Sequence, residues 1–399
     1  MKWREGKVMK RLLRSVVLPI TISLVFFSSS FAYASEQQVN IAPHATSALL
    51  LEVDTGTVLY EKNAHEKLPP ASITKVMTLL LIMEAIERGE LKLTDKVKTS
   101  ERAASMGGSQ IFLQTGEEMT VEDMIKGIAI ASGNDASVAM AEHIGGTEEA
   151  FVAKMNERAK QLGMKNTNFV NANGLPAPDH YSSAMDIGIM SRELLKHELI
   201  TKYTGIYQDY LRKDSGNPFW LVNTNRLVRF YEGVDGLKTG YTTEAKFCLT
   251  ATAKRNNMRV LAVVLGEPNP KTRNNEVSAM FNYAFNHYQV FPVYKKGDQV
   301  QAVKVDKGKE TTVNVITSQA VSLLTKKGET PDMYEKEVLV APNIKAPVKK
   351  DDVIGHIFIR TKDGKEVARI NLMPEKTIEQ AGLWEILKRT SKNILISYQ

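Results

Sequence analysis

The feature that most constrains the fold of this chain is a run of apolar residues at helical spacing, which extends from Ser72 to about Gly89. Pro69 and Pro70 precede the run, and prolines suit the approach to the start of a helix. Apolar side chains occur on almost every side of the predicted helix, and a helix with that pattern is buried. The chain must therefore build a core that surrounds this helix.

The remaining pattern predicts strands on both sides of a helical middle. Residues 47–62 contain two β-rich runs joined by Asp54-Thr55-Gly56, which predicts a hairpin. Helices are predicted at 120–132, 148–162, 184–197 and 274–288, and strands at 233–242 and on either side of the turn Arg255-Asn256-Asn257. Strands, many helices and then strands again indicate an α+β fold and not a repeating βαβ unit. We place this first domain at residues 35–290.

A second, smaller domain is predicted after residue 290. Residues 291–381 are rich in Val, Ile, Thr and Lys with alternating polarity, and Asp363-Gly364 marks a turn, so we expect a small all-β domain. The tail, residues 382–399, combines apolar residues and Trp384 with basic residues, which is typical of an amphipathic helix in a membrane interface. The alternatives for the tail are packing against its own β domain and a contact between two copies of the chain.

The first 34 residues have the pattern of a secretory signal peptide. Six basic residues precede an apolar run, Val16 to Phe27, and the segment ends in Ala32-Tyr33-Ala34. A membrane anchor is the alternative, but the run is shorter than the ~20 residues of a spanning helix. Removal of residues 1–34 would lower the formal net charge from +7 to +2, so charge gives no case for nucleic-acid binding. We expect an exported protein that acts outside the cytoplasm.

Several absent motifs exclude other chemistries. The chain has one cysteine, Cys248, so it forms no internal disulfide, and the apolar surroundings of Cys248 indicate a small buried side chain. The seven histidines form neither His-Glu-x-x-His nor His-x-His, so a zinc peptidase is not expected. The sequence also lacks Gly-x-Ser-x-Gly, the nucleophile motif of α/β-hydrolases, and a Gly-rich phosphate loop. We expect neither a metal nor a cofactor.

Three short motifs carry the chemistry. Ser72 and Lys75 stand three residues apart at the start of the buried helix, so their side chains share one face. A serine hydroxyl needs a base to take its proton, and a lysine serves as that base when burial or a second cation lowers its pKa. Ser132-Gly133-Asn134 ends the next predicted helix, and Lys238-Thr239-Gly240 lies on a predicted strand and supplies a second cation. The order of the three motifs is harder to explain by chance than any one of them.

In this order the motifs resemble those of the serine acyl-transferases that react with penicillin. The stretches "SALLLEVDTGTVLYEKNAHEKLPPASITKVMTLLLIMEAI", "IASGNDASVAMAEHIGG", "TNFVNANGLP" and "GVDGLKTGYT" are similar to the low-molecular-mass D-alanyl-D-alanine carboxypeptidases. The resemblance covers about residues 46–291 and extends into the β domain. It implies an antiparallel sheet flanked by helices, an accessory β domain, and a Gram-positive cell-wall enzyme similar to the sporulation-linked members.

The resemblance also implies catalytic roles. Ser72 attacks the carbonyl between the two terminal D-alanines of a peptidoglycan stem pentapeptide, and Lys75 accepts its proton. Ser132 relays a proton to the leaving D-alanine, and the backbone N–H groups of Ser72 and Tyr241 stabilise the oxyanion. β-Lactam antibiotics would acylate the same serine, and water would release the acyl group.

Substrate-binding roles follow from the same resemblance. Asn134 contacts the amide backbone of the substrate, Lys238 and Thr239 hold its terminal carboxylate, and Gly240 leaves the strand bare so that substrate can add as a further strand. One departure from the family pattern stands close by. Many members have a small Ala-Gly pair after this motif, whereas this chain has Ala245-Lys246, which leaves the local strand geometry open.

Three alternative functions stay open at this stage. A serine β-lactamase shares the acylation machinery, but Gly133 stands where class A enzymes have Asp, and no convincing Glu-x-x-x-Asn segment supplies their deacylating Glu. A DD-endopeptidase uses the same residues on a cross-linked substrate. A non-catalytic scaffold that binds the cell wall through the β domain and tail would be expected to have a damaged motif, and all three motifs are intact.

Overall fold

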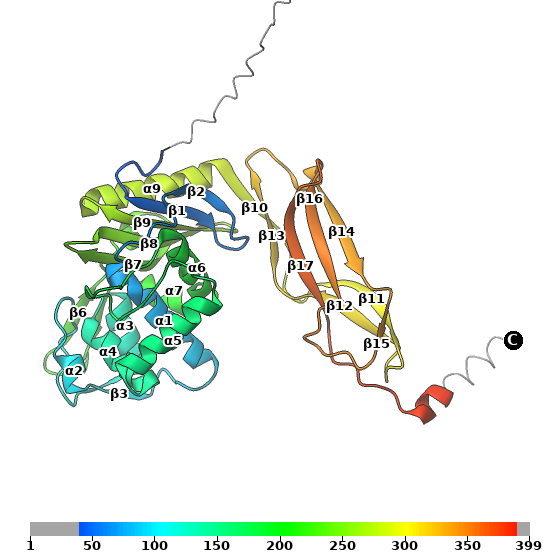
Figure 1. Cartoon of the computed structure of the whole chain (residues 1–399), viewed down its shortest axis with the longest axis horizontal. Coiled ribbons are helices and arrows are strands. Elements are labelled where there is room, and N and C mark those ends of the chain that lie inside the picture. The colour runs from blue at the N-terminus through cyan, green and yellow to red at the C-terminus, as the bar shows by residue number, and fades with distance from the viewer. Residues whose placement is uncertain (1–39, 389–399) are drawn as a thin grey trace, which may run out of the picture. The chain divides into compact units, whose positions relative to one another are not determined.

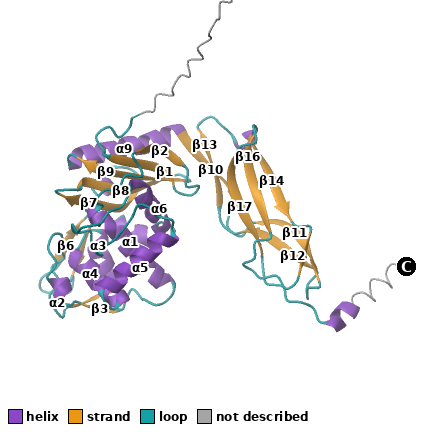
Figure 2. Cartoon of the chain, in the orientation of Figure 1, coloured by secondary structure: helices purple, strands orange, loops and turns teal. Residues whose placement is uncertain are grey.

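The computed structural model describes residues 40–388. The predicted signal peptide at 1–34 and the end of the predicted tail, residues 389–399, lie outside the described residues. The first part of the fold is built on a five-stranded antiparallel sheet (Figures 1 and 2). In sheet order its strands are β2 (Val58–Lys62), β1 (Ser47–Glu52), β9 (Met258–Glu267), β8 (Lys246–Arg255) and β7 (Val234–Thr242).

Both faces of this sheet are covered by helices, so alternate residues of each strand enter different cores. On β1, Leu49 and Leu51 pack with the helical cluster, whereas Ala48 and Leu50 pack on the other side under α9 (Pro270–His287). The period of two in the strand therefore sorts its side chains into two layers. Figure 1 shows α9 along one face of the sheet and α6 (Ala184–Leu194) on the opposite face.

The helix predicted from the apolar run is buried as expected, within the helical cluster. It begins as a short 3-10 turn, η1 (Ala71–Thr74), and continues as α1 (Lys75–Glu87), in which nine of thirteen residues are buried. The other long helices of the cluster are α3 (Val121–Ala129), α4 (Asn134–Gly145) and α5 (Glu148–Gln161). Shorter elements complete this part of the chain: α2 (Glu101–Ala104), α7 (Leu199–Thr204), α8 (Leu227–Phe230), and the strand pairs β3 (Lys96–Lys98) with β4 (Glu118–Thr120) and β5 (Gln208–Leu211) with β6 (Phe219–Val222).

Helix α4 was not predicted from the sequence, and the second motif lies differently from the expectation. The helix predicted at 120–132 ends at Ala129, and Ser132 belongs to the link before α4, which starts at Asn134. Helix α4 is rich in small residues and is buried on all sides through most of its length, so it lacks the polar face that marks an amphipathic helix.

The predicted β domain is present. A six-stranded sheet has the order β14 (Tyr334–Val340), β16 (Gly355–Thr361), β17 (Glu366–Pro374), β12 (Thr312–Thr317), β11 (Gln299–Asp306) and β15 (Asn343–Lys345), and a second pair joins β10 (Tyr288–Tyr294) to β13 (Val321–Lys326). Its core is aliphatic and includes Val315, Ile357 and Leu372. Residues 383–388 then form a short helix on which Leu383 and Trp384 are 82% and 80% exposed. No helix among residues 40–388 combines the length and apolar character needed to cross a membrane.

Candidate active site

The turn η1 places Ser72 beside Lys75. Ala71 has a φ of +47°, an unusual value for alanine, and the chain then turns through Ser72 and enters α1 at Lys75. The Nζ atom of Lys75 lies 2.9 Å from the Oγ atom of Ser72, so the first motif forms the pair that its spacing predicts. Ser72 is partly exposed, whereas Lys75 is fully buried.

The surroundings of Lys75 suit a base that is neutral before the reaction. Its Nζ atom lies 2.6 Å from Asn134 Oδ1 and 2.5 Å from the backbone oxygen of Asn173. A neutral amine has two N–H groups, which satisfy these two oxygens, and one lone pair, which remains for the hydroxyl of Ser72. Burial, with a smaller contribution from the nearby Lys238 ammonium, holds the pKa of Lys75 well below its usual value.

The second motif is held in the link between α3 and α4. Ser132 has a φ of +65° and is nearly buried, and strained backbone of this kind is concentrated at functional sites. The side-chain amide nitrogen of Asn134 donates to the carbonyl of Gly107 at 2.6 Å, while its oxygen accepts from Lys75. The next residue, Asp135, accepts hydrogen bonds from the backbone N–H groups of Ile111 and Leu113, which fixes the start of α4.

The third motif lies on β7, which is the edge strand of the sheet. The Lys238 side chain is buried and donates to the Thr239 carbonyl at 3.0 Å. Burial, and to a smaller degree the guanidinium of Arg273, lowers the pKa of Lys238 to about 7. The Thr239 hydroxyl donates to Thr224 Oγ1 at 2.7 Å, and Tyr241 is 56% exposed with its ring against Phe247.

Two glycines let other segments approach the nucleophile closely. A Cβ atom at Gly240 would lie 2.9 Å from the Pro70 carbonyl oxygen and 3.2 Å from the Ala71 Cβ, so Gly240 allows β7 to pack on η1. This reason differs from the one that the resemblance implied, which was a bare strand for substrate. At Gly174, whose φ is +85°, a Cβ would lie 1.9 Å from the Ala71 carbonyl oxygen. The backbone on both sides of Ser72 is therefore fixed by close contact.

A pocket of 520 Å³ opens in front of these residues, and we name it the carboxylate-side pocket. Of the residues predicted from the sequence, its lining includes Ser72, Ser132, Thr239, Gly240 and Tyr241. The other three, Lys75, Asn134 and Lys238, are buried. The three motifs, which span 169 positions of the sequence from Ser72 to Gly240, are thus brought to one site.

Arg273 is a residue of this pocket that sequence analysis missed. It stands in the first turn of α9, lines the carboxylate-side pocket, and is nearly buried; its guanidinium donates to Asn274 Oδ1. The helix was predicted to start at Asn274, but Asn269 caps it and Pro270 opens it. That Asn-Pro pair was the available signal, because it places Arg273 inside the helix and next to the end of β9.

Other nucleophiles and metal ligands do not form a competing site in the part of the chain described. Cys248 is buried, and burial raises the pKa of its thiol to about 11. Across residues 40–388, no three His, Cys, Asp or Glu side chains come together as metal ligands would. His180 is buried, and its Nδ1 accepts from the Val170 N–H, so its Nε2 donates to Thr74 Oγ1 at 2.7 Å.

Comparisons with known proteins agree with this geometry. The family model of D-alanyl-D-alanine carboxypeptidase matches residues 33–269, and that of penicillin-binding protein 5, C-terminal domain, matches residues 288–380. The chain is 54% identical over 383 residues to D-alanyl-D-alanine carboxypeptidase DacF of Bacillus subtilis (strain 168), which covers 96% of this chain and 98% of that protein.

Solved structures are similar as well. Penicillin-binding protein 5 from Haemophilus influenzae has a TM-score of 0.71 and 30% identity, with 84% of this chain and 98% of that chain covered. Penicillin-binding protein D2 from Listeria monocytogenes in its ampicillin-bound form has a TM-score of 0.55 and 30% identity, with 61% of this chain and 98% of that chain covered.

Proposed function

Because the chain belongs to the D-alanyl-D-alanine carboxypeptidase family of serine hydrolases, we propose that Ser72 is its nucleophile and that its substrate is the peptidoglycan stem pentapeptide. The observation that carries this proposal is the contact of 2.9 Å between Ser72 Oγ and the buried Nζ of Lys75. A low pKa leaves Lys75 a neutral amine, and a neutral amine can take the serine proton.

The acylation step follows from these positions. The Lys75 lone pair accepts the Ser72 proton while Oγ bonds to the carbonyl carbon between the two D-alanines. Negative charge develops on the carbonyl oxygen, where the backbone N–H groups of Ser72 and Tyr241 stabilise it. The C–N bond then breaks, Ser132 relays the proton from Lys75 to the leaving amine, and D-alanine departs, which leaves Lys75 neutral again. Water later hydrolyses the ester on Ser72, which restores the free hydroxyl.

The carboxylate-side pocket supplies the cations that a carboxypeptidase substrate needs. Thr239 borders it from β7 and Arg273 borders it from α9, while the neighbouring Lys238 is buried and senses the charge of Arg273. We assign the terminal carboxylate to these three residues, because two cations near one hydroxyl suit a carboxylate. The side-chain oxygen of Asn134 accepts a hydrogen bond from Lys75. We therefore propose that Asn134 positions Lys75, in addition to the substrate contact that the resemblance implies.

Release of D-alanine from a synthetic stem pentapeptide tests the proposal. We expect release by the wild type and none by Ser72→Ala, with both proteins folded by circular dichroism. Release by Ser72→Ala at the wild-type rate would contradict the assignment of the nucleophile.

Intact-mass spectra after penicillin addition separate the alternative functions. A lasting adduct supports the carboxypeptidase, rapid drug turnover supports a β-lactamase, and failure to form any adduct supports a scaffold.

Location and domain roles are part of the proposal. Residues 1–34 direct export, residues 35–290 trim the wall outside the cytoplasm, and residues 291–381 are an accessory domain. Loss of the terminal D-alanine removes a donor for later cross-linking, so the process served is wall maturation and cell shape. The resemblance to the sporulation-linked members of the family extends the proposal to sporulation, and the timing of expression during spore formation tests that extension.

The tail, residues 382–399, is proposed to contact the membrane surface. Leu383 and Trp384 are largely exposed on the short helix 383–388, and an amphipathic helix with tryptophan suits the interface. Co-sedimentation with anionic liposomes tests this contact. We expect the mature protein to sediment with the vesicles and a protein that ends at Gly382 to stay in solution; equal sedimentation of the two would rule the contact out.

A further inference from the structure

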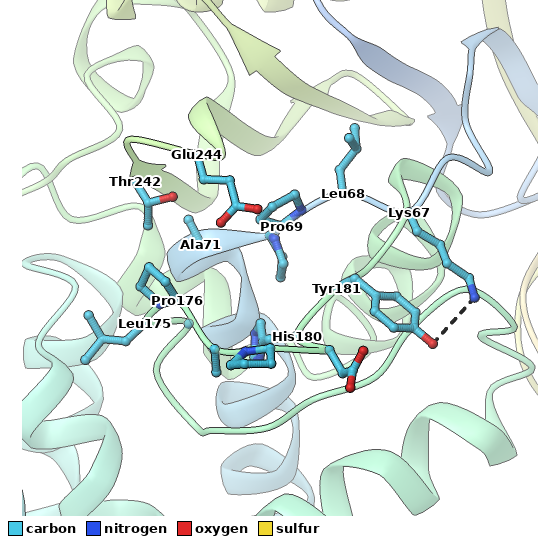
Figure 3. Close-up of a pocket in the computed structure, with 15 residues that line it drawn as sticks. Lys67, Leu68, Pro69, Ala71, Leu175, Pro176, His180, Tyr181, Thr242 and Glu244 are labelled. Carbon is cyan, nitrogen blue, oxygen red and sulfur yellow. Dashed lines mark hydrogen bonds between the residues drawn. The ribbon is translucent and has the colours of Figure 1, made fainter.

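A second pocket, of 530 Å³, lies beside the turn η1, which carries Ser72 (Figure 3). We name it the acyl-side pocket, and it is lined by residues 67–71, residues 174–181, Thr242 and Glu244. Ala71, the residue before the nucleophile, forms part of its wall. Strand β7 contributes to both pockets: Thr239 to Tyr241 face the carboxylate-side pocket, and Thr242 faces this one. Its volume is within the range of small-molecule sites.

The direction of the substrate decides what enters this pocket. The proposed function places the terminal carboxylate near Lys238 and the reacting carbonyl at Ser72. A peptide added along the free edge of β7 then continues past Tyr241 toward Thr242, at ~3.3 Å per residue. The residue next to the acylated D-alanine is the third residue of the stem peptide. Its side chain therefore reaches the acyl-side pocket.

Three charged side chains line the acyl-side pocket: Glu244, Lys67 and the exposed Asp179. In Figure 3 the Glu244 side chain extends toward Pro69, and Lys67 stands beside Tyr181 at the other end. Lys67 Nζ lies 3.5 Å from the Tyr181 hydroxyl and 4.6 Å from the centre of its ring. Within residues 40–388 neither Lys67 nor Glu244 forms an ion pair. Both charges are therefore available to a ligand.

The pocket is formed before substrate arrives. Gly174 holds one end of its loop against Ala71, and Asn171 Oδ1 accepts a hydrogen bond of 2.7 Å from the Gly174 N–H. At the other end of the loop, His180 is bonded to Thr74 and Val170. Between the charges the lining is largely apolar and includes Leu68, Pro69, Leu175 and Pro176. Such a surface suits methylene groups.

We propose that the acyl-side pocket selects the third residue of the stem peptide, and that it prefers a diamino acid whose side chain ends in both an ammonium and a carboxylate. The inference rests on the proposed function. Glu244 receives the ammonium, Lys67 receives the carboxylate, and the apolar lining covers the methylene groups between the peptide backbone and these two ends. A lysine at the third position offers the ammonium alone and leaves Lys67 without a partner.

Three pentapeptides that differ only at the third residue test the inference: one with meso-diaminopimelate, one with lysine and one with alanine. The measurement is kcat/KM for D-alanine release. The wild type is expected to favour the diaminopimelate peptide over the lysine peptide by about fivefold, which is what a partly exposed ion pair contributes. Lys67→Met abolishes that preference. Glu244→Gln lowers kcat/KM on both charged peptides relative to the alanine peptide.

The control is Glu335→Gln, which removes an exposed carboxylate from β14 and is expected to keep the wild-type ratios. Equal kcat/KM for the three peptides, a preference for lysine, or a preference that survives Lys67→Met would overturn the inference while the proposed function stands. Failure to release D-alanine from any of the peptides, including the alanine peptide, would instead reject the proposed function on which the inference rests.

Discussion

The side-chain oxygen of Asn134 lies 2.6 Å from the buried Nζ atom of Lys75. This contact joins the second motif to the first, because the same Nζ atom lies 2.9 Å from Ser72 Oγ. An uncharged amide oxygen orients the amine without favouring its protonated form as strongly as a carboxylate would. The residue at 134 therefore controls the position of the proposed base, and a charge at 134 would change the pKa of that base.

Replacement of Asn134 by Asp tests that control. A carboxylate next to Lys75 favours the ammonium, so it raises the pKa of Lys75. Since only the neutral amine can take the Ser72 proton, the acid limb of the pH profile for acylation by benzylpenicillin moves to higher pH. The pH profile of the second-order acylation rate measures the shift. Asn217→Asp, an exposed site away from the three motifs, serves as the control, and identical profiles for Asn134→Asp and wild type would contradict the account.

The charge state of Lys238 predicts a pH dependence of substrate binding. Its pKa is lowered to about 7, so its charged fraction falls as the pH rises through that value. The charged form attracts the substrate carboxylate, and KM for the pentapeptide should increase about fivefold between roughly pH 6.5 and 8.5, with a smaller change in kcat. A pentapeptide that ends in a carboxamide lacks that charge, and its KM should stay flat. Parallel KM profiles for the two peptides would argue against the assignment.

His180 predicts how stability depends on pH. Burial lowers its pKa from 6.5 to about 4, so the unfolded state binds more protons between these values. Stability is therefore lost as the pH falls from about 6.5 to about 4, by up to roughly 3 kcal/mol. His180→Asn lacks this titration, and the gap in free energy of unfolding between wild type and variant should narrow over that range.

Urea unfolding at several pH values gives the measurement for His180. Glu267 acts in the opposite direction, because burial raises its pKa to about 8, but it is present in both proteins and cancels from the difference. A gap of constant size between pH 7 and pH 4 would show that His180 is not the titrating group.

The unusual Lys246 predicts a stabilising substitution. Its φ is +56°, a conformation that glycine adopts without the penalty of a Cβ atom, and its side chain is exposed. Many family members have a glycine at this position, and the positive φ of Lys246 shows that lysine and glycine are compatible with the same strand geometry. Lys246→Gly should raise the free energy of unfolding by about 1 kcal/mol, whereas Lys246→Ala should not. Thermal unfolding of Lys246→Gly and Lys246→Ala measures the difference in stability. Equal melting temperatures for the two variants would contradict the prediction.

Local sequence patterns predicted much of this fold. The hairpin of β1 and β2, the buried helix α1 and the alternating strands of the β domain each carry a periodic signal over consecutive residues. Helix α4 carries none, because it is buried nearly all round and consists largely of small residues. The three motifs were found for the same reason as the strands: their residues are neighbours in the sequence.

Other parts of the site depend on contacts between distant segments and left no local pattern. The third partner of Lys75 is the backbone oxygen of Asn173, an atom that every residue possesses. Gly174 is required by its approach to Ala71, about a hundred positions earlier, and Arg273 reaches the site only because α9 begins beside the end of β9. Such relationships become visible only once the chain is folded.

The most direct test of the central claim, that neutral Lys75 activates Ser72, is the rate at which benzylpenicillin acylates Ser72 in wild type and Lys75→Arg. Arginine is positively charged and does not lose its proton near neutral pH, so it cannot serve as the base. We predict an adduct on Ser72 of the wild type and acylation slower by about 10²–10⁴-fold in Lys75→Arg, with both proteins folded. Acylation of Lys75→Arg at the wild-type rate, or an adduct that maps to another residue, would contradict the account.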